Sequence, residues 1–471
     1  MAKRRIATGL CFSTAVFCIS IANAGFDPDR FYIGTMCIAT NAQTEAHFRD
    51  MHDCGIDYVL GLRFPADEKY DLCVKYGIDV IEHRLSRWWA TFDDAKWQKL
   101  LPLRRNDHQV EIDKMAGKRI HPAIKMLSIG DEPSALRYDL LAKSVAEVNR
   151  RMPNTPAFLN LNPSYGRLAE SADKLAESHL GAVTYQDYID QYCRKVPTDH
   201  ISVDVYAVPE RKTPQAIRYL EGCLYGSCQV ISDACLRYGR TFWFMPQANM
   251  RPNADFPITA NMMRHQAYVA MAYGAERLCW ACWTPREVGG GWWKENVLDE
   301  NGEKTPRYWM LKEVNAEIHR IAKEFMRYRP IGTTLVGGDA EDELDAKGRV
   351  QIRRTGEFAD GFVTGLKASD GSRLAVGARV SRHGGTERGR AYFVTACGDL
   401  VDEKRAVHEV VFSSAMPVRV LDADGSVPLT KRPDGTFAFQ LADSRAVLIM
   451  QWKPSDALCI IEGEQCFDIM E

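Results

Sequence analysis

The stretch Lys125-Met-Leu-Ser-Ile-Gly-Asp-Glu-Pro133 is a short apolar run that ends in two adjacent carboxylates and a proline. Buried parallel strands have this pattern, and the proline with the helix-like segment behind it indicates that the strand ends there. Asp131 and Glu132 would then follow the carboxyl end of a strand, where barrel and doubly wound enzymes place their chemistry. Because strand residues alternate between faces, only one carboxylate can point straight into a pocket while the other supports it. The alternative is a helix N-terminus, where the helix dipole favours acidic residues.

Around this stretch, strand-like runs alternate with helix-like segments. The eight runs are Phe31–Ala39, Tyr58–Arg63, Ile78–Arg84, Met126–Gly130, Ala157–Asn162, Ile201–Val208, Thr241–Gln247 and Arg277–Thr284. This alternation predicts an α/β fold with a parallel sheet. Eight repeats predict closure into a (β/α)8 TIM barrel over residues 25–329. The alternative, an open doubly wound sheet, usually carries a glycine-rich phosphate loop, and the sequence contains neither G-x-G-x-x-G nor a Walker motif.

The pattern changes after Arg329-Pro330. Short alternating apolar runs follow, separated by turn residues such as Asp370-Gly371 and Asp434-Gly435. They predict a smaller antiparallel β-sandwich over residues 330–453, followed by a tail at 454–471. No constellation of catalytic residue types occurs in this part, so we expect it to have a structural role.

The first 24 residues have the three parts of a secretory signal. Lys3 to Arg5 are basic, Ile6 to Ile21 are mostly apolar, and Ala22-Asn23-Ala24 is a small-x-small cleavage site. We therefore expect export to the periplasm or the exterior. No later stretch reads as a membrane span, and a net charge of −2 gives no indication of a nucleic-acid or membrane-surface partner.

The spacing of cysteines and histidines bears on disulfides and on metal sites. Export makes disulfides possible, and two pairs are close in sequence: Cys459 with Cys466, and Cys223 with Cys228. Cys279-x-x-Cys282 has redox or zinc spacing, but on a strand these two residues would face opposite ways. The eleven histidines show no H-E-x-x-H motif or clustered spacing, so we expect neither a metal nor a cofactor.

Polar and aromatic side chains gather at the expected carboxyl ends of the strands. They are Arg63, Glu82, Asp131, Glu132, Asn160, Asn162, Tyr165, Asp204, Tyr206, Gln247, Asn249, Trp283 and Glu287. Interior barrel positions are normally bulky and apolar, so packing alone does not require this set. Trp88-Trp89 and Trp292-Trp293 add flat aromatic faces, which suit the apolar faces of sugar rings unless they serve only as core. The rim therefore predicts a glycan substrate.

Glycoside hydrolysis is the chemistry that this set supports best, because it needs two carboxyl groups across the scissile bond. The group that stays protonated gains a raised pKa from neighbouring carboxylates, since like charges resist joint ionisation. Glu132 fits this role, with Asp131 beside it. Its partner is Asp204, Asp131 or Glu287, in falling order of preference. The absence of a G-x-S-x-G elbow argues against a serine hydrolase.

Ser128-Ile-Gly-Asp-Glu-Pro133 resembles the fourth-strand motif of clan A glycoside hydrolases, in which an Asn-Glu-Pro-type sequence carries the acid/base glutamate. The resemblance covers the barrel and implies that Glu132 is this residue. Two further runs, Leu159-Asn-Leu-Asn-Pro-Ser-Tyr165 and Ile201-Ser-Val-Asp-Val-Tyr206, are similar to runs in exported bacterial barrel hydrolases, where a sandwich after the barrel is usual. The chain departs from the clan at Asp131, which replaces the usual asparagine. It also departs at Gln247, where a nucleophile glutamate is expected.

Two other interpretations remain open. The Asp131-Glu132 pair also resembles that of the substrate-assisted N-acetylhexosaminidases, in which the aspartate orients the acetamido group and the glutamate is the acid. That mechanism needs no glutamate at the end of the seventh strand. The third interpretation is a carbohydrate-binding barrel that has lost its nucleophile and does not catalyse.

Overall fold

The computed structural model describes most of the chain. The described residues are 25–63, 66–83, 112–285, 287–288, 291–338, 350, 352–382, 389–398, 400–401 and 405–451. The expected signal, the tail, and Trp88 and Trp89 lie outside them.

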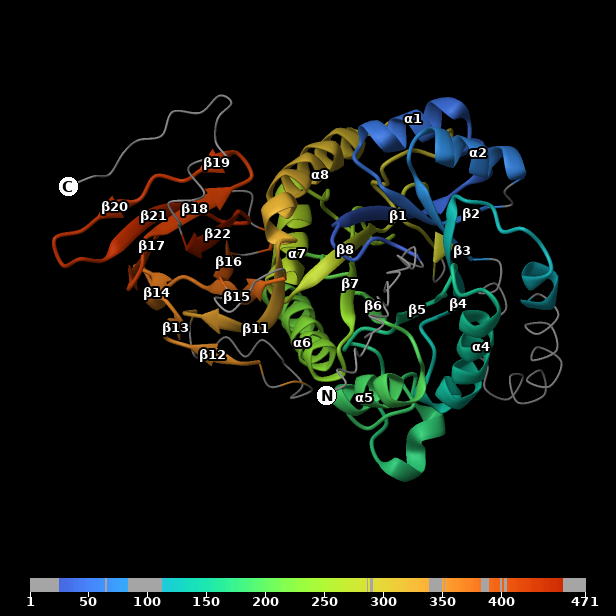
Figure 1. Ribbon diagram of the computed structural model, residues 1–471, viewed down its shortest axis with the longest axis horizontal. Helices are drawn as coiled ribbons and strands as arrows, with labels where there is room; N and C mark the ends of the chain where they lie inside the picture. The colour runs from blue at the N-terminus through green and yellow to red at the C-terminus, as the bar shows by residue number, and fades with distance from the viewer. Residues whose placement is uncertain are drawn as a thin grey trace, which may run out of the picture.

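The first part of the chain is a closed barrel of eight parallel strands in sequential order (Figure 1). The strands are β1 (Tyr32–Ile38), β2 (Tyr58–Leu62), β3 (Asp79–Glu82), β4 (Ile124–Asp131), β5 (Ala157–Leu161), β6 (His200–Asp204), β7 (Thr241–Met245) and β8 (Ala275–Trp280). The predicted barrel is confirmed. Strand β4 runs to Asp131, so Glu132 is the first residue beyond it.

Helices cover the outside of the barrel. They are α1 (Glu45–Asp53), α2 (Asp67–Lys75), α4 (Tyr138–Arg151), α5 (Tyr185–Lys195), α6 (Pro214–Tyr238), α7 (Ala260–Ala272) and α8 (Pro306–Phe325), with the short 3-10 helices η1 (Thr40–Ala42), η3 (Ala135–Arg137) and η4 (Ala172–Glu177). Local sequence sets the ends of α6. The Thr213 side chain caps its first turn, Pro214 begins it, and Gly239 ends it with φ 66°, a left-handed conformation that glycine adopts readily.

The strands from β11 (Tyr328–Val336) onward form two sheets beside α6, α7 and α8, antiparallel except where β12 (Arg354–Thr355) pairs in parallel with β11 (Figure 1). One sheet contains β12, β11, β15 (Leu374–Ser381), β16 (Arg390–Ala396), β22 (Ala446–Gln451), β18 (Val418–Asp422) and β19 (Gly425–Ser426), in that spatial order. The other contains β13 (Phe358–Asp360), β14 (Val363–Ala368), β17 (Val407–Ser414), β21 (Phe437–Ala442) and β20 (Thr430–Lys431). An apolar core lies between them, which confirms the predicted β-rich part of the fold.

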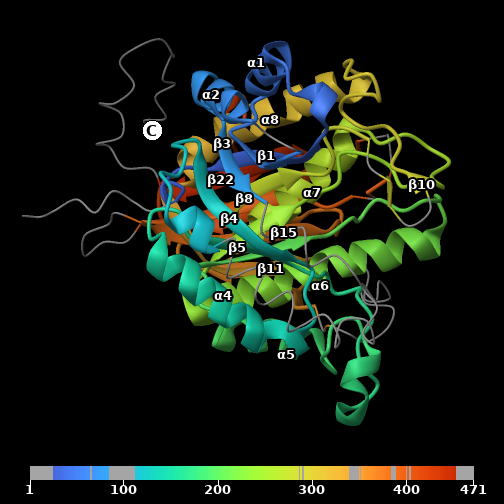
Figure 2. The same ribbon diagram turned by 90° about the vertical axis from the view of Figure 1, so that its right-hand side faces the viewer.

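The barrel interior changes from apolar to polar along the strands. Its lower layers hold aromatic and aliphatic side chains such as Tyr58, Phe158 and Trp243. Towards the carboxyl ends of β5 and β6 the inward positions become Asn160 and Asp204, both buried. A small hairpin of β9 (Glu287–Val288) and β10 (Gly291–Trp292) follows β8, and β10 lies at one end of the barrel in Figure 2. The fold therefore assembles polar groups at one mouth.

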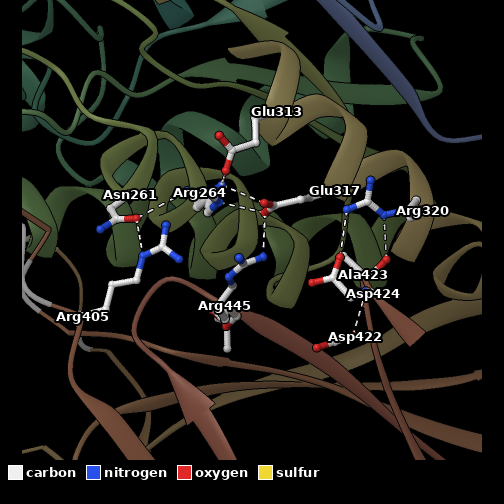
Figure 3. Close-up of polar contacts among 11 residues, drawn as sticks. Asn261, Arg264, Glu313, Glu317, Arg320, Arg405, Asp422, Ala423, Asp424 and Arg445 are labelled. Atoms are coloured by element: carbon white, nitrogen blue, oxygen red, sulfur yellow. Dashed lines mark hydrogen bonds and ion pairs between the residues drawn. The ribbon is translucent and has the colours of Figure 1, made fainter. Parts of the chain in front are cut away.

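A buried ionic network joins α7 and α8 to the sandwich (Figure 3). Arg264 of α7 is fully buried and donates two hydrogen bonds of 2.7 Å to the carboxylate of Glu317 on α8. Arg445, in the turn before β22, lies 3.0 Å from the same carboxylate. Arg264 also pairs with Glu313, whose side chain is exposed. Removing Glu317 therefore leaves buried Arg264 with one solvent-exposed partner and takes from Arg445 its ion pair with Glu317, which destabilises a protein far more than loss of an exposed pair.

We therefore expect Glu317→Ala to lower the free energy of unfolding by about 3 kcal/mol, measured by urea unfolding. Glu324→Ala, also on α8, is the control, because it removes an exposed ion pair with Arg327. It should change the free energy of unfolding by less than about 1 kcal/mol. Equal stabilities of the Glu317→Ala protein and the wild type would contradict this account of the interface.

The structure excludes one of the two possible disulfides. Cys223 and Cys228 are both buried free thiols on α6. Five residues apart on a helix, their side chains point about 140° apart around its axis, so they do not meet. Cys459 and Cys466 lie outside the described residues. Within the described part of the chain, no helix is long and apolar enough to cross a membrane.

Candidate functional site

Asn160 joins two carboxylates at the mouth of the barrel. Its Nδ2 lies 3.2 Å from Oδ1 of Asp131 and 2.8 Å from Oδ1 of Asp204. Its own Oδ1 accepts a hydrogen bond of 3.0 Å from the hydroxyl of Ser202, which fixes which way the amide points. Three neighbouring strands, β4, β5 and β6, thus bring together two predicted catalytic residues and one predicted substrate contact.

A bulge in β4 helps to place Asp131. The register between β4 and β5 shifts between Ser128 and Gly130, and Asp131 is then paired with Asn160. A bulge re-aims the side chains that follow it, and such bulges are frequent beside active sites. Asp131 is exposed, so it is available to a ligand at the mouth.

Asp204 is buried, with a relative exposure of 6%. This burial, together with the charge of Asp131, raises the pKa of Asp204 to about 6, although hydrogen bonds from Asn160 and Tyr206 act in the opposite direction. Asp204 therefore exchanges a proton near neutral pH, which is unusual for an aspartate and common for acid–base groups in active sites.

Glu132 has an unusual backbone conformation, with φ 46°. The backbone of a residue other than glycine adopts this left-handed conformation at a cost of about 1–2 kcal/mol, and only where neighbouring groups hold it there. Here the Glu132 N–H donates to the carbonyl of Asn160 at 3.0 Å, and its carbonyl accepts from Nδ2 of Asn162 at 2.8 Å. The next carbonyl, of Pro133, accepts from the Tyr188 hydroxyl at 2.8 Å. Such strain at a strand end supports a functional role for Glu132.

Two tyrosines and a tryptophan accompany the carboxylates. The Tyr165 hydroxyl accepts a hydrogen bond of 3.1 Å from the backbone N–H of Tyr206, and the Tyr206 ring packs edge-on against Trp293 at 5.1 Å. Burial, and then the nearby charges of Asp204 and Glu132, raise the pKa values of both tyrosines. The predicted residues Tyr165 and Tyr206 therefore lie at the site with the acids.

Other predicted contacts are part of the scaffold. Gln247 and Asn249 are fully buried. Gln247 accepts from the N–H of Val208 at 3.2 Å and donates to the carbonyl of Asn249 at 2.7 Å. Both ends of its amide are therefore used to hold the loops after β6 and β7. Asn162 has a comparable supporting role, because its amide fixes the backbone of Glu132.

Two predicted substrate contacts point away from the mouth. Glu82 is 2% exposed and accepts a hydrogen bond from Tyr70 of α2, on the outer side of β3. Trp283 is fully buried and packs against Tyr308 of α8, with 6.1 Å between ring centroids, so it offers no free face to a sugar. Arg63 is exposed at the end of β2, and Glu287 lies in β9.

Two residues near the site were not predicted. Arg251 follows β7, and its positive charge acts on Tyr165, so it lies near the carboxylates. Extending the list of strand ends by two residues beyond Asn249 would have found it. Tyr188 lies on α5 and holds Pro133 and Asn162, but a tyrosine on a helix carries no sequence signal for that role. No group of three His, Cys, Asp or Glu within the described ranges is placed to hold a metal ion.

Comparison with known proteins is informative only at the level of structure. No family model matches the sequence, and no curated protein matches it. The chain is similar in structure to Gan42B, a GH42 β-galactosidase from G. stearothermophilus, in a catalytic mutant form: the TM-score is 0.55, identity is 9%, and the match covers 90% of this chain and 98% of that one. A second Gan42B structure gives a TM-score of 0.53 at 8% identity, with the same coverage. At these identities the similarity shows the fold alone, and these neighbours are glycoside hydrolases.

Proposed function

We propose that this protein is a glycoside hydrolase that cleaves oligo- or polysaccharides, with Glu132 as general acid/base and Asp204 as its partner. The observation that carries the proposal is the shared amide of Asn160, which binds Asp131 and Asp204 beside the constrained Glu132. Glycoside hydrolysis requires a pair of carboxyl groups. Barrel enzymes place their catalytic residues at the carboxyl ends of the strands. The glycosidase activity of the structural neighbours is consistent with it.

In this proposal the carboxylic acid of Glu132 gives its proton to the leaving glycosidic oxygen. The ionised carboxylate of Asp204 attacks the anomeric carbon, or removes a proton from the water that does so. If Asp204 is the nucleophile, water then hydrolyses the glycosyl–enzyme and gives its proton to Glu132. If Asp204 is the base, it keeps the proton of the attacking water, and both groups return to their starting forms by proton exchange with solvent. Asp131 raises the pKa of Asp204 through its charge, and Asn160 orients both aspartates.

A second candidate is the substrate-assisted mechanism of N-acetylhexosaminidases. The observation that favours it is Gln247, a buried amide without an ionised form, at the position where the clan nucleophile is expected. In this mechanism Asp131, exposed at the mouth and held by Asn160, would orient a 2-acetamido group. Only sugars with that group would then be good substrates.

An activity screen tests the proposal. The purified protein is incubated with a panel of 4-nitrophenyl glycosides that includes β-galactosides and N-acetylhexosaminides. We expect nitrophenol release from at least one member. Binding of glycans without any hydrolysis would contradict the proposal and support the alternative of a non-catalytic carbohydrate-binding barrel.

We also propose that the protein is exported and cleaved after Ala24, on the basis of the signal-like first 24 residues. Mass spectrometry of the exported protein should find Gly25 at the N-terminus. An exported form that retains Met1 would contradict this.

A further inference from the structure

Arg251 lies in the loop after β7, at the same end of the barrel as the proposed catalytic carboxylates. The residue before it, Met250, forms an isolated bridge with Lys294 through two backbone hydrogen bonds of 2.8 Å. Because this bridge is antiparallel, the next position along each segment is occupied by Arg251 and Trp293, which are therefore neighbours. Two loops thus bring an arginine and a tryptophan together at the mouth.

Trp293 connects this pair to the tyrosines of the site. It is 7% exposed, and its ring packs edge-on against Tyr206 with 5.1 Å between ring centroids. The backbone N–H of Tyr206 in turn donates to the Tyr165 hydroxyl at 3.1 Å. A continuous set of contacts therefore runs from the loop of Arg251 to Tyr165.

The Tyr165 hydroxyl is influenced by the charges of the site. Burial has the largest effect on its pKa and raises it. The charges of Asp204 and Glu132 raise this pKa further, whereas the charge of Arg251 lowers it. The guanidinium and both carboxylates therefore lie around the same hydroxyl.

The side chains of Arg251 and Trp293 have buried donors that the rest of the protein does not use. In the part of the chain that the structure describes, the buried Nε of Arg251 has no hydrogen-bond acceptor, and no carboxylate forms an ion pair with its guanidinium. The indole Nε1 of Trp293 is also buried and has no acceptor among the described residues. Buried N–H groups nearly always have a partner, so two such donors beside a catalytic pair indicate that the acceptor arrives with the substrate.

The chemistry of these donors favours a carboxylate as the acceptor. A guanidinium presents parallel N–H groups that match the two oxygens of a carboxylate, and Nε–H is one of them. An indole N–H can only donate. A carboxylate on a sugar at this mouth would also be repelled by Asp131 and Asp204 unless a cation balanced it, and Arg251 supplies that charge.

We propose that Arg251, assisted by Trp293, binds the carboxylate of a uronic acid residue, and that the substrates of this protein are uronides. Their cleavage rests on the proposed function, whereas the preference for a carboxylate rests on the two buried donors. An arginine that served only to balance the charge of the catalytic carboxylates would affect acidic and neutral sugars alike, which gives the inference a direct test.

Steady-state kinetics on matched 4-nitrophenyl glycosides provide this test. The α- and β-forms of the galacturonide and glucuronide are each compared with the galactoside or glucoside, which has a hydroxymethyl group in place of the carboxylate. We expect kcat/KM to be at least tenfold higher for one uronide than for its neutral counterpart. Arg251→Gln should lower this preference by about tenfold or more, and Trp293→Phe, which keeps a ring but removes the N–H, by about fivefold.

Lys294→Gln is the matched control, because it removes an exposed cation next to Trp293 and should change the preference by less than about twofold. Hydrolysis of neutral glycosides without preference for any uronide would overturn the inference and leave the hydrolase. An equal loss on both substrates in Arg251→Gln would also overturn it.

Failure of the proposed function is a separate result, in which no glycoside is hydrolysed. Isothermal titration calorimetry with free galacturonate and glucuronate then tests the site alone. Binding of either acid by the wild type, at least tenfold weaker in Arg251→Gln, would keep the carboxylate site and lose the hydrolase. No binding of either acid would overturn the site as well.

Discussion

Glu132→Gln is expected to lower turnover on a natural glycan by about two to four orders of magnitude. The amide keeps the shape of the side chain but has no proton to give to the leaving oxygen. The backbone of residue 132 should stay in place, because its N–H donates to Asn160 and its carbonyl accepts from Asn162. Steady-state kcat and kcat/KM measure the loss.

The leaving group separates a missing acid from a damaged site. A dinitrophenyl glycoside needs little protonation to leave, so the Glu132→Gln protein should lose much less activity on it than on a natural glycan. Glu170→Gln, on the surface beside Lys174, is the control and should behave as wild type. Full activity of Glu132→Gln on a natural glycan would exclude Glu132 as the acid.

Asp204→Asn is expected to lower turnover by at least about three orders of magnitude, whatever the 2-substituent of the sugar. An amide cannot act as an ionised nucleophile or base. In the wild type the reacting form is the ionised one, so kcat/KM should rise with pH through about 6, the pKa of Asp204. The pH profile of kcat/KM between pH 4 and 8 checks this.

The same substitution should stabilise the fold at neutral pH. The pKa of Asp204 is about 6 in the folded protein and about 3.9 in an unfolded chain, so the folded state binds the proton more tightly. Its contribution to stability is therefore fully present below about pH 3.9 and is lost as the pH rises through 6. Asp204→Asn should exceed the wild type by about 2–3 kcal/mol at pH 7 and by little at pH 4. A variant that loses both activity and stability at pH 7 would contradict this.

The barrel could be predicted because its signal repeats. Eight apolar runs, each followed by a helix-like segment, leave few alternatives, and small errors at strand ends do not change the topology. The pair Cys223 and Cys228, which sequence distance left possible as a disulfide, does not form one, because sequence distance does not include helical geometry. Both residues are on α6, where a separation of five places them on different sides.

The site was predictable only in part, because successive side chains at a strand end point alternately into and out of the barrel. Glu82 follows the inward-facing Ile81 and therefore points outward to Tyr70. Asp204 lies two residues after Ser202 on the same strand, so both side chains point into the barrel. The position of Asp131 instead depends on the bulge in β4, which the amino-acid composition does not predict. The sequence places Trp283 at the rim because it stands at the end of the eighth strand-like run, but its burial against α8 is a tertiary property.

Kinetics of a matched pair of 4-nitrophenyl glycosides, with and without a 2-acetamido group, test the central claim most directly. The wild type, Glu132→Gln, Asp131→Asn and Asp204→Asn proteins are compared on both substrates. The account predicts severe losses for Asp204→Asn on either sugar, a loss for Glu132→Gln that is similar on both sugars, and a milder loss for Asp131→Asn. Activity on the acetamido sugar alone, with severe losses for Asp131→Asn and Glu132→Gln and a near-normal rate for Asp204→Asn, would instead establish the substrate-assisted mechanism. Near-normal rates in all three variants would contradict the assignment of these carboxylates.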